Sequence, residues 1–278
     1  MNYIEVYFEP VDENLTGLLV AELTLAGAES FWQDSDRLRA YFTPVSLDKN
    51  QIQNLADRYS AAGHHLHYGI QQITSKSWDV AQDDSFEPIV IGNQCRVRGS
   101  KDKVADCYPY ELVVNPSLSF GSGHHPSTSL CLAMQLEMDF QGKAVLDIGC
   151  GSGILSLLAE KLGAVKIDAI DNNPWATEVA GENFHLNNSR HINLQEADIS
   201  SADIASTYPI VLANLNAPVL LCELPRIAAS VEKGGELVIS GYMEKDEQAI
   251  HALAHASALK LKKIQYKNQW IAALFEKE

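Results

Sequence analysis

The sequence has few cysteines, and none of them form the close pairs that metal sites and redox motifs use. The five cysteines are scattered along the 278 residues and are odd in number: Cys95, Cys107, Cys131, Cys150 and Cys222. This pattern disfavours a disulfide framework and also a zinc site built from C-x-x-C pairs. Reduced thiols are typical of the cytosol, so we expect a cytoplasmic protein without a metal centre.

Long apolar segments are also missing. No run reaches the roughly 20 residues that a membrane-spanning helix needs. The start, Met-Asn-Tyr-Ile-Glu, lacks the basic region and apolar stretch of a secretory leader. Because 46% of the residues are hydrophobic, the chain can still bury the cores of one large or two modest domains. We therefore expect an unexported protein with no membrane partner.

Positive charge is scarce. The chain has 21 Lys and Arg against 36 Asp and Glu, for a formal net charge of −15. A protein that binds a phosphate backbone normally presents a basic face, so nucleic acid is disfavoured as the direct substrate. An acidic surface suits a basic protein partner through long-range attraction, although acidity can equally serve solubility alone. The sequence leaves the oligomeric state open.

Residues 1–74 predict a small α+β domain. Its pattern indicates four strands and two helices in the order β-α-β-β-α-β, near 2–9, 12–26, 28–33, 37–43, 47–62 and 65–74. This order is typical of a ferredoxin-like sandwich, and we assign the domain to substrate recognition. Residues 75–95 mix acids with Trp78, Phe86 and Pro88 and have little periodicity, so they predict a linker.

Residues 96–278 predict a second domain in which strands and helices alternate. Strands near 89–98 and 110–115 lead into it. The remaining elements are expected near 125–139, 144–148, 153–162, 165–170, 174–187, 192–195, 209–213, 217–229, 235–240, 244–257, 259–267 and 270–275. Alternation of this kind predicts a mostly parallel sheet covered on both faces, with an antiparallel hairpin at its edge.

One glycine is missing where a dinucleotide-binding loop needs it. Residues 145–153 read Val-Leu-Asp-Ile-Gly-Cys-Gly-Ser-Gly, but the last glycine of a G-x-G-x-x-G fingerprint would fall on Ile154. Gly149, Gly151 and Gly153 stand instead at alternate positions. Such a loop lets the turn between strand and helix lie against a ligand where any Cβ would collide.

A carboxylate follows the next strand of this unit. Asp171 stands at its end, where it can accept both hydroxyls of a ribose. Asp198, after the third strand, can accept from an adenine amino group or cap a helix, and the sequence leaves both open. The glycine loop resembles motif I of the class I methyltransferases, which use S-adenosyl-L-methionine (AdoMet).

Two further segments narrow this resemblance. They read Phe-Gly-Ser-Gly-His-His-Pro-Ser-Thr (120–128) and Leu-Ala-Asn-Leu-Asn-Ala-Pro (212–218). With the glycine loop they resemble the PrmA family, the ribosomal protein L11 methyltransferases. Members of that family carry Phe-Gly-Thr-Gly-Thr-His-Pro-Thr-Thr, Gly-Cys-Gly-Ser-Gly-Ile-Leu and Ala-Asn-Ile-Leu. The resemblance is strong over 118–241 and looser before it, where the linker residues are also similar.

The resemblance implies a fold, a cofactor and a reaction. The fold is a class I methyltransferase domain, a Rossmann-like sheet of seven mostly parallel strands, preceded by the ferredoxin-like domain. The cofactor is AdoMet and its product is S-adenosyl-L-homocysteine. By position, the family's AdoMet contacts fall on Thr128, Gly149, Asp171 and Asn214, and we add the other two glycines of the loop. The implied reaction methylates lysine and α-amino groups of a large-subunit ribosomal protein.

Asn214 is also the candidate catalytic residue. A lysine has a reference pKa of about 10.4, so it must lose a proton before it attacks. The side-chain oxygen of a strand-end Asn can accept the amine hydrogens and aim the lone pair, or it can simply satisfy backbone groups. His124 and Asn216 stand where the family has threonine and leucine, which leaves the fine substrate selectivity open.

Two other functions are compatible with these motifs. One is a class I methyltransferase that acts on a small molecule or on nucleic acid. The acidic net charge disfavours nucleic acid as its substrate. The other is a binding module that keeps the AdoMet site without turnover. The intact glycine loop and Asp171 disfavour such a module. The number and order of methyl additions, and any motion between the domains, are open.

Overall fold

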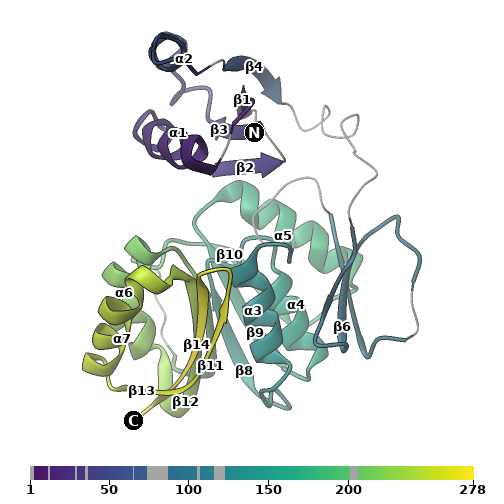
Figure 1. The fold of residues 1–278 in the computed structure, drawn as a ribbon. Coiled ribbons are helices and arrows are strands. Elements are labelled where there is room, and N and C mark those ends of the chain that lie inside the picture. The colour runs from purple at the N-terminus through teal and green to yellow at the C-terminus, as the bar shows by residue number, and fades with distance from the viewer. Residues whose placement is uncertain are drawn as a thin grey trace. The chain divides into compact units, whose positions relative to one another are not determined.

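The computed structural model describes residues 3–11, 13–28, 30–34, 37–64, 66–73, 87–104, 107–115, 123–200 and 206–278. The chain forms two compact units, residues 1–83 and residues 84–278 (Figure 1). Within the described residues, no helix is both long and apolar enough to cross a membrane.

The first unit is a four-stranded antiparallel sheet with two helices. Its elements are β1 (Tyr3–Glu9), α1 (Glu13–Leu25), β2 (Ser30–Asp34), β3 (Arg37–Phe42), α2 (Lys49–Ala61) and β4 (His67–Ile73). The strands lie in the order β2-β3-β1-β4, and every neighbouring pair is antiparallel. The order of elements along the chain is the one that the sequence predicts. The ferredoxin-like classification itself stays a prediction.

This unit has a hydrophobic core of its own. Leu15, Leu19 and Leu23 follow one another at helical spacing along α1, and all three are buried. They pack in one cluster with the alternate strand residues Val6 and Phe8. A separate core allows the first unit to hold its structure by contacts within itself.

The second unit is built on a seven-stranded sheet. Its elements are α3 (Pro126–Gln135), β8 (Ala144–Ile148), α4 (Ile154–Lys161), β9 (Lys166–Asp171), α5 (Pro174–Leu186), β10 (Ile192–Glu196), β11 (Tyr208–Asn214), α6 (Ala217–Ala229), β12 (Val231–Met243), η1 (Glu244–Asp246), α7 (Glu247–Ala256), β13 (Leu259–Lys267) and β14 (Trp270–Lys277). The strand order is β10-β9-β8-β11-β12-β14-β13. The first five strands are parallel and the last two are antiparallel. This confirms the predicted sheet.

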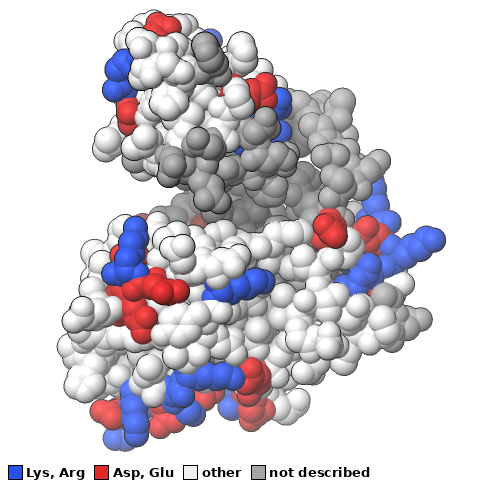
Figure 2. All heavy atoms as spheres, in the orientation of Figure 1, with Lys and Arg blue, Asp and Glu red and all other residues white. Residues whose placement is uncertain are grey.

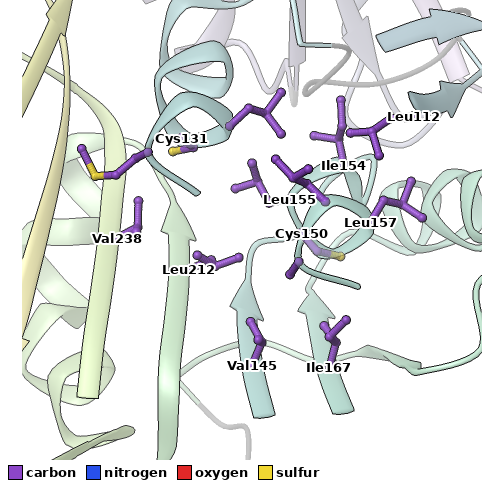
Figure 3. Packing of buried hydrophobic residues seen from close by; sticks show 14 of the residues in the cluster. Leu112, Cys131, Val145, Cys150, Ile154, Leu155, Leu157, Ile167, Leu212 and Val238 are labelled. Carbon is purple, nitrogen blue, oxygen red and sulfur yellow. The ribbon is translucent and has the colours of Figure 1, made fainter. Parts of the chain in front are cut away.

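Helices cover both faces of this sheet, with α3, α4 and α5 on one face and α6 and α7 on the other (Figure 1). Successive residues of β8 alternate between the two faces, so Val145 belongs to one buried cluster and Leu146 to the other. In the first cluster, α4 places Leu155 and Leu157 above Val145 and Ile167 (Figure 3). Burial on both faces holds the strand ends in fixed positions.

A small second sheet precedes α3. It comprises β5 (Ile89–Ile91), β6 (Cys95–Gly99) and β7 (Tyr110–Val114), in that order. The sequence predicts one strand over 89–98, but Gly92 and Asn93 both have φ of 56° and turn the chain back on itself. The last part of segment 75–95 thus forms strand β5 of this sheet and buries Ile91 in the core. Residues 75–86 of the predicted linker lie outside the described residues. Residues 87 and 88 are described and directly precede β5.

Two element boundaries also differ from the sequence expectation. The helix predicted over 125–139 ends at Gln135, where the backbone N–H groups of Glu137 and Met138 bond to carbonyls three residues back in tighter turns. The strand predicted over 235–240 runs from Val231 to Met243, because it also pairs with β14 along its C-terminal half. Neither change moves a candidate site residue to another element.

Charged side chains of both signs lie beside one another on the face of the second unit seen in Figure 2. Lys262 bonds to Glu236 at 2.9 Å and to Glu276 at 3.1 Å, and Lys263 bonds to Glu137. Some of the acids are therefore already paired with bases, and these pairs leave the net charge of −15 unchanged.

Candidate active site

The glycine loop joins the end of β8 to the start of α4. Gly149, Gly151 and Gly153 have φ of 68°, 54° and 75°, in the left-handed region that residues with a Cβ rarely adopt. A Cβ on Gly149 would lie 2.4 Å from Leu215 Cδ2, and one on Gly153 would lie 2.3 Å from Phe184 Cε1. Both the backbone conformation and the close neighbours therefore require glycine at the two ends of the loop.

Asp171 ties the end of β9 to this loop. Gly151 donates its backbone N–H to Asp171 Oδ2 at 2.8 Å, and Asn173 donates its N–H to Oδ1 at 2.9 Å. A carboxylate has about four lone-pair positions, so each oxygen retains the capacity to accept from a hydroxyl. The structure thus brings Asp171 beside the glycine loop, as ribose binding at this position would need.

Thr128 and Asn214 meet although they lie far apart in the chain. Asn214 ends β11 and donates from Nδ2 to Oγ1 of Thr128, in the first turn of α3, at 3.3 Å across 86 residues. Ala213 of β11 pairs with Ile148 of β8, so Asn214 stands beside Gly149, one position further along. The candidate residues therefore gather at the carboxyl edge of the sheet, where open α/β sheets bind ligands.

The start of α3 is held by its own cap and by the β13–β14 hairpin. His125 is the N-cap, and its Nδ1 accepts the backbone N–H of Ser127. Burial lowers the pKa of His125, which favours the neutral ring that can accept this bond. From the hairpin, Trp270 places its ring edge-on to His125 with centroids 4.4 Å apart, and Lys267 Nζ donates to Ser129 Oγ at 2.9 Å.

A family model described as ribosomal protein L11 methyltransferase (PrmA) matches residues 13–278. The chain belongs to the PrmA family. A relative from Porphyromonas gingivalis, named ribosomal protein L11 methyltransferase, is 34% identical over 99% of this chain and 98% of its own. One from Phocaeicola vulgatus with the same name is 31% identical over 99% of both chains.

The fold of this PrmA family member agrees with a solved structure. The crystal structure of the ribosomal protein L11 methylase from Lactobacillus delbrueckii subsp. bulgaricus superposes with a TM-score of 0.64 at 23% identity. The match covers 69% of this chain and 100% of the other. Together with the seven-stranded sheet, it establishes the class I methyltransferase fold. Membership in the PrmA family implies AdoMet as the cofactor.

Asp147 also lies inside the glycine motif, but its position in this motif alone predicts no role for it. Its side chain is fully buried in β8, and Ser156 Oγ donates to Oδ2 at 2.6 Å. Burial raises the pKa of Asp147 to about 7. The signal was present in the sequence, because an acid within an apolar strand is costly unless it finds a partner.

The environment of Asp147 fits the amino acid part of AdoMet. Oδ1 of Asp147 is buried and has no hydrogen-bond partner in the described part of the chain. An ammonium group such as the one AdoMet carries would supply a donor and favour the charged carboxylate. The family's AdoMet positions and this acceptor are therefore compatible with the same ligand, with Asp147 near the ammonium and Asp171 on the ribose.

Two polar residues near the edge have local structural contacts. Asp198 Oδ1 accepts from the N–H and Oγ of Ser200 at 2.7 and 2.6 Å, and Oδ2 accepts from Asn172 at 3.2 Å. These are the contacts of a turn cap rather than of a helix cap, and the role on adenine stays a prediction. Asn216 is the N-cap of α6 and accepts the N–H of Val219 at 3.0 Å, which gives this departure from the family pattern a structural reason.

Part of the family motif lies outside the described residues, namely 120–122. Within the ranges that are described, no group of three His, Cys, Asp or Glu side chains is placed to hold a metal ion. The roles of the individual site residues stay predictions. What the structure adds is their common position and the contacts that fix them.

Proposed function

We propose that this protein transfers methyl groups from AdoMet to lysine and α-amino groups of ribosomal protein L11. Relatives matched over nearly the full chain are named for that substrate. The observation that supports the proposal most strongly is the bond from Asn214 to Thr128. It joins two positions of the family's AdoMet pattern at the strand edge that also carries the glycine loop.

Asn214 is placed to orient an attacking amine. AdoMet, when bound, would supply a methyl group on a positively charged sulfur, and S-adenosyl-L-homocysteine would be the leaving group when a neutral amine attacks the methyl carbon. Because Nδ2 of Asn214 already donates to Thr128, its Oδ1 is the atom left to accept an N–H of the substrate. Within the described residues, Oδ1 has no donor. An acceptor at this point aims the lone pair of the amine, and solvent can take the proton that the lysine loses.

We further propose that residues 1–74 recognise the protein substrate and that 75–95 connect them to the catalytic unit. The first unit has its own core and carries none of the candidate cofactor residues, so a separate binding task suits it. The excess of acidic residues would favour a basic protein partner. This arrangement lets one catalytic site serve several amines of one substrate.

The test is methylation of a defined substrate. The full chain is incubated with AdoMet and with unmethylated large-subunit ribosomal proteins, and each protein is then analysed by intact mass. The proposal predicts increments of methyl size on L11 that need AdoMet and that localise to lysines and the α-amine. Absence of any increment on a ribosomal protein would favour the alternative of a class I enzyme acting on a small molecule.

A further inference from the structure

The loop that begins α3 contacts the segment through which the chain enters the second unit. His124 Nε2 lies 2.9 Å from the backbone carbonyl oxygen of Glu87, two residues before β5. A carbonyl oxygen only accepts hydrogen bonds, so His124 donates through Nε2–H. This bond spans 37 residues and connects the start of the catalytic unit to the loop that presents Thr128.

A second contact lies next to the first. Gly123 has φ of +93°, and a Cβ placed on it would lie 2.4 Å from Ile89 Cδ1 and 3.6 Å from Ile154 Cδ1. The Ile89 side chain therefore rests against the backbone of the loop, close to the first residue of α4. Ile154 directly follows Gly153. The entering segment thus touches the loop that leads to Thr128, and this loop in turn lies next to Ile154 at the end of the glycine loop.

The contact through His124 depends on the length of the side chain. Nε2 is four bonds from Cα, whereas the hydroxyl of threonine, the residue in the family pattern, is only two bonds away. A threonine at 124 could not reach the Glu87 carbonyl at the present backbone positions. Glutamine places an N–H donor four bonds from Cα and could replace the bond.

We propose that His124 is a positioning residue that couples occupancy of the AdoMet site to the order of Glu87–Ile91. This inference rests on the proposed function, since it takes AdoMet as the ligand. A ligand bound at Thr128 and the glycine loop restricts the loop that precedes α3. Through His124, that loop then restricts the segment from which the connection to the first unit starts. Coupling of this kind is reciprocal, so restraint of the segment by a bound protein substrate tightens AdoMet binding.

The test is hydrogen–deuterium exchange of the full chain with and without AdoMet. In the wild type, AdoMet slows exchange of peptides that cover 87–91 by about two- to tenfold, the equilibrium effect of one hydrogen bond. His124→Gln keeps this protection, and His124→Thr loses it. His255→Thr is the matched control, because His255 is exposed in α7 and its replacement leaves the protection unchanged.

AdoMet binding is measured by calorimetry in the same samples. This separates a failure of the proposed coupling from a failure of the proposed function. If the wild type binds AdoMet but 87–91 gain no protection, or if His124→Thr is protected like the wild type, the coupling is wrong and the proposed function stands. If the wild type does not bind AdoMet, both fail. As a further readout, excess L11 lowers the AdoMet Kd of the wild type and of His124→Gln but not of His124→Thr.

Discussion

Asn214 and Asn216 stand two positions apart and have different contacts. Asn214 reaches across the edge of the sheet to Thr128, whereas Asn216 turns back to cap its own helix. The sequence alone shows two asparagines near a strand end. Only the hydrogen bonds in the structure distinguish the residue that faces the candidate site from the residue that stabilises α6.

This difference predicts that the two alanine variants affect different quantities, kcat in one and stability in the other. Asn214→Ala removes the acceptor for the amine, so kcat falls about tenfold to a hundredfold. Asn216→Ala keeps kcat and lowers the free energy of unfolding by about 1 kcal/mol through loss of the cap. Steady-state kinetics and denaturant unfolding measure the two effects. Full turnover with unchanged AdoMet affinity in Asn214→Ala would rule out its role in catalysis.

Asp147 predicts that AdoMet binding releases a proton. With a pKa of about 7 in the free protein, this carboxyl is about 0.9 protonated at pH 6. A bound ammonium favours the carboxylate and lowers the pKa, so the proton leaves when the complex forms. Calorimetric titration at pH 6 in buffers of different ionisation enthalpy counts the released protons. Asp147→Asn, which cannot ionise, is the control, and equal proton release from both proteins would contradict the assignment.

The same pKa has a consequence for stability without ligand. Because burial raises the pKa of Asp147 in the folded state from its ordinary value of 3.8, the stabilisation from the protonated carboxyl is fully present below about pH 4. It is lost as the pH rises toward 7. The free energy of unfolding of Asp147→Asn should therefore fall less than that of the wild type over this range. Parallel pH curves for the two proteins would contradict the buried, ionisable state of this group.

At the scale of elements, periodicity and strand-end motifs predict the order of strands and helices and the edge that carries the site. They do not predict the turn at Gly92, because the apolar stretch 89–91 and the alternating stretch 95–99, separated by three residues, read as one strand. Nor do they predict that the β13–β14 hairpin packs on the start of α3. Trp270 and His125 are 145 positions apart in the sequence, and contacts of that separation depend on the tertiary fold rather than on a local pattern.

That packing predicts a role for Trp270 in holding the start of α3. Trp270→Ala removes the ring contact with His125, which is typically worth about 0.5–1.5 kcal/mol, so the AdoMet Kd rises about two- to tenfold. Trp270→Phe retains an aromatic edge and binds AdoMet almost as the wild type does. Tyr266→Phe, in the same hairpin but half exposed, serves as the control. Unchanged affinity in Trp270→Ala would show that the hairpin does not position the loop.

At the scale of the whole molecule, the separate cores predict separable tasks. Leu19 lies in the core of the first unit and Leu212 in that of the second. Leu19→Ala should lower the stability of the first unit by about 2–5 kcal/mol and reduce methylation of protein, with no change in the AdoMet Kd. Leu212→Ala should weaken AdoMet binding itself. Loss of AdoMet affinity in Leu19→Ala would contradict the division of tasks.

Thr128, Gly149, Asp171 and Asn214 are proposed to form one site for AdoMet and not for a dinucleotide. Thermal denaturation of the full chain without ligand, with AdoMet and with NAD tests it directly. A ligand present at a hundred times its Kd stabilises the folded state by about 2.7 kcal/mol. We expect AdoMet to raise the Tm and NAD to leave it unchanged. A raised Tm with NAD alone would contradict this proposal.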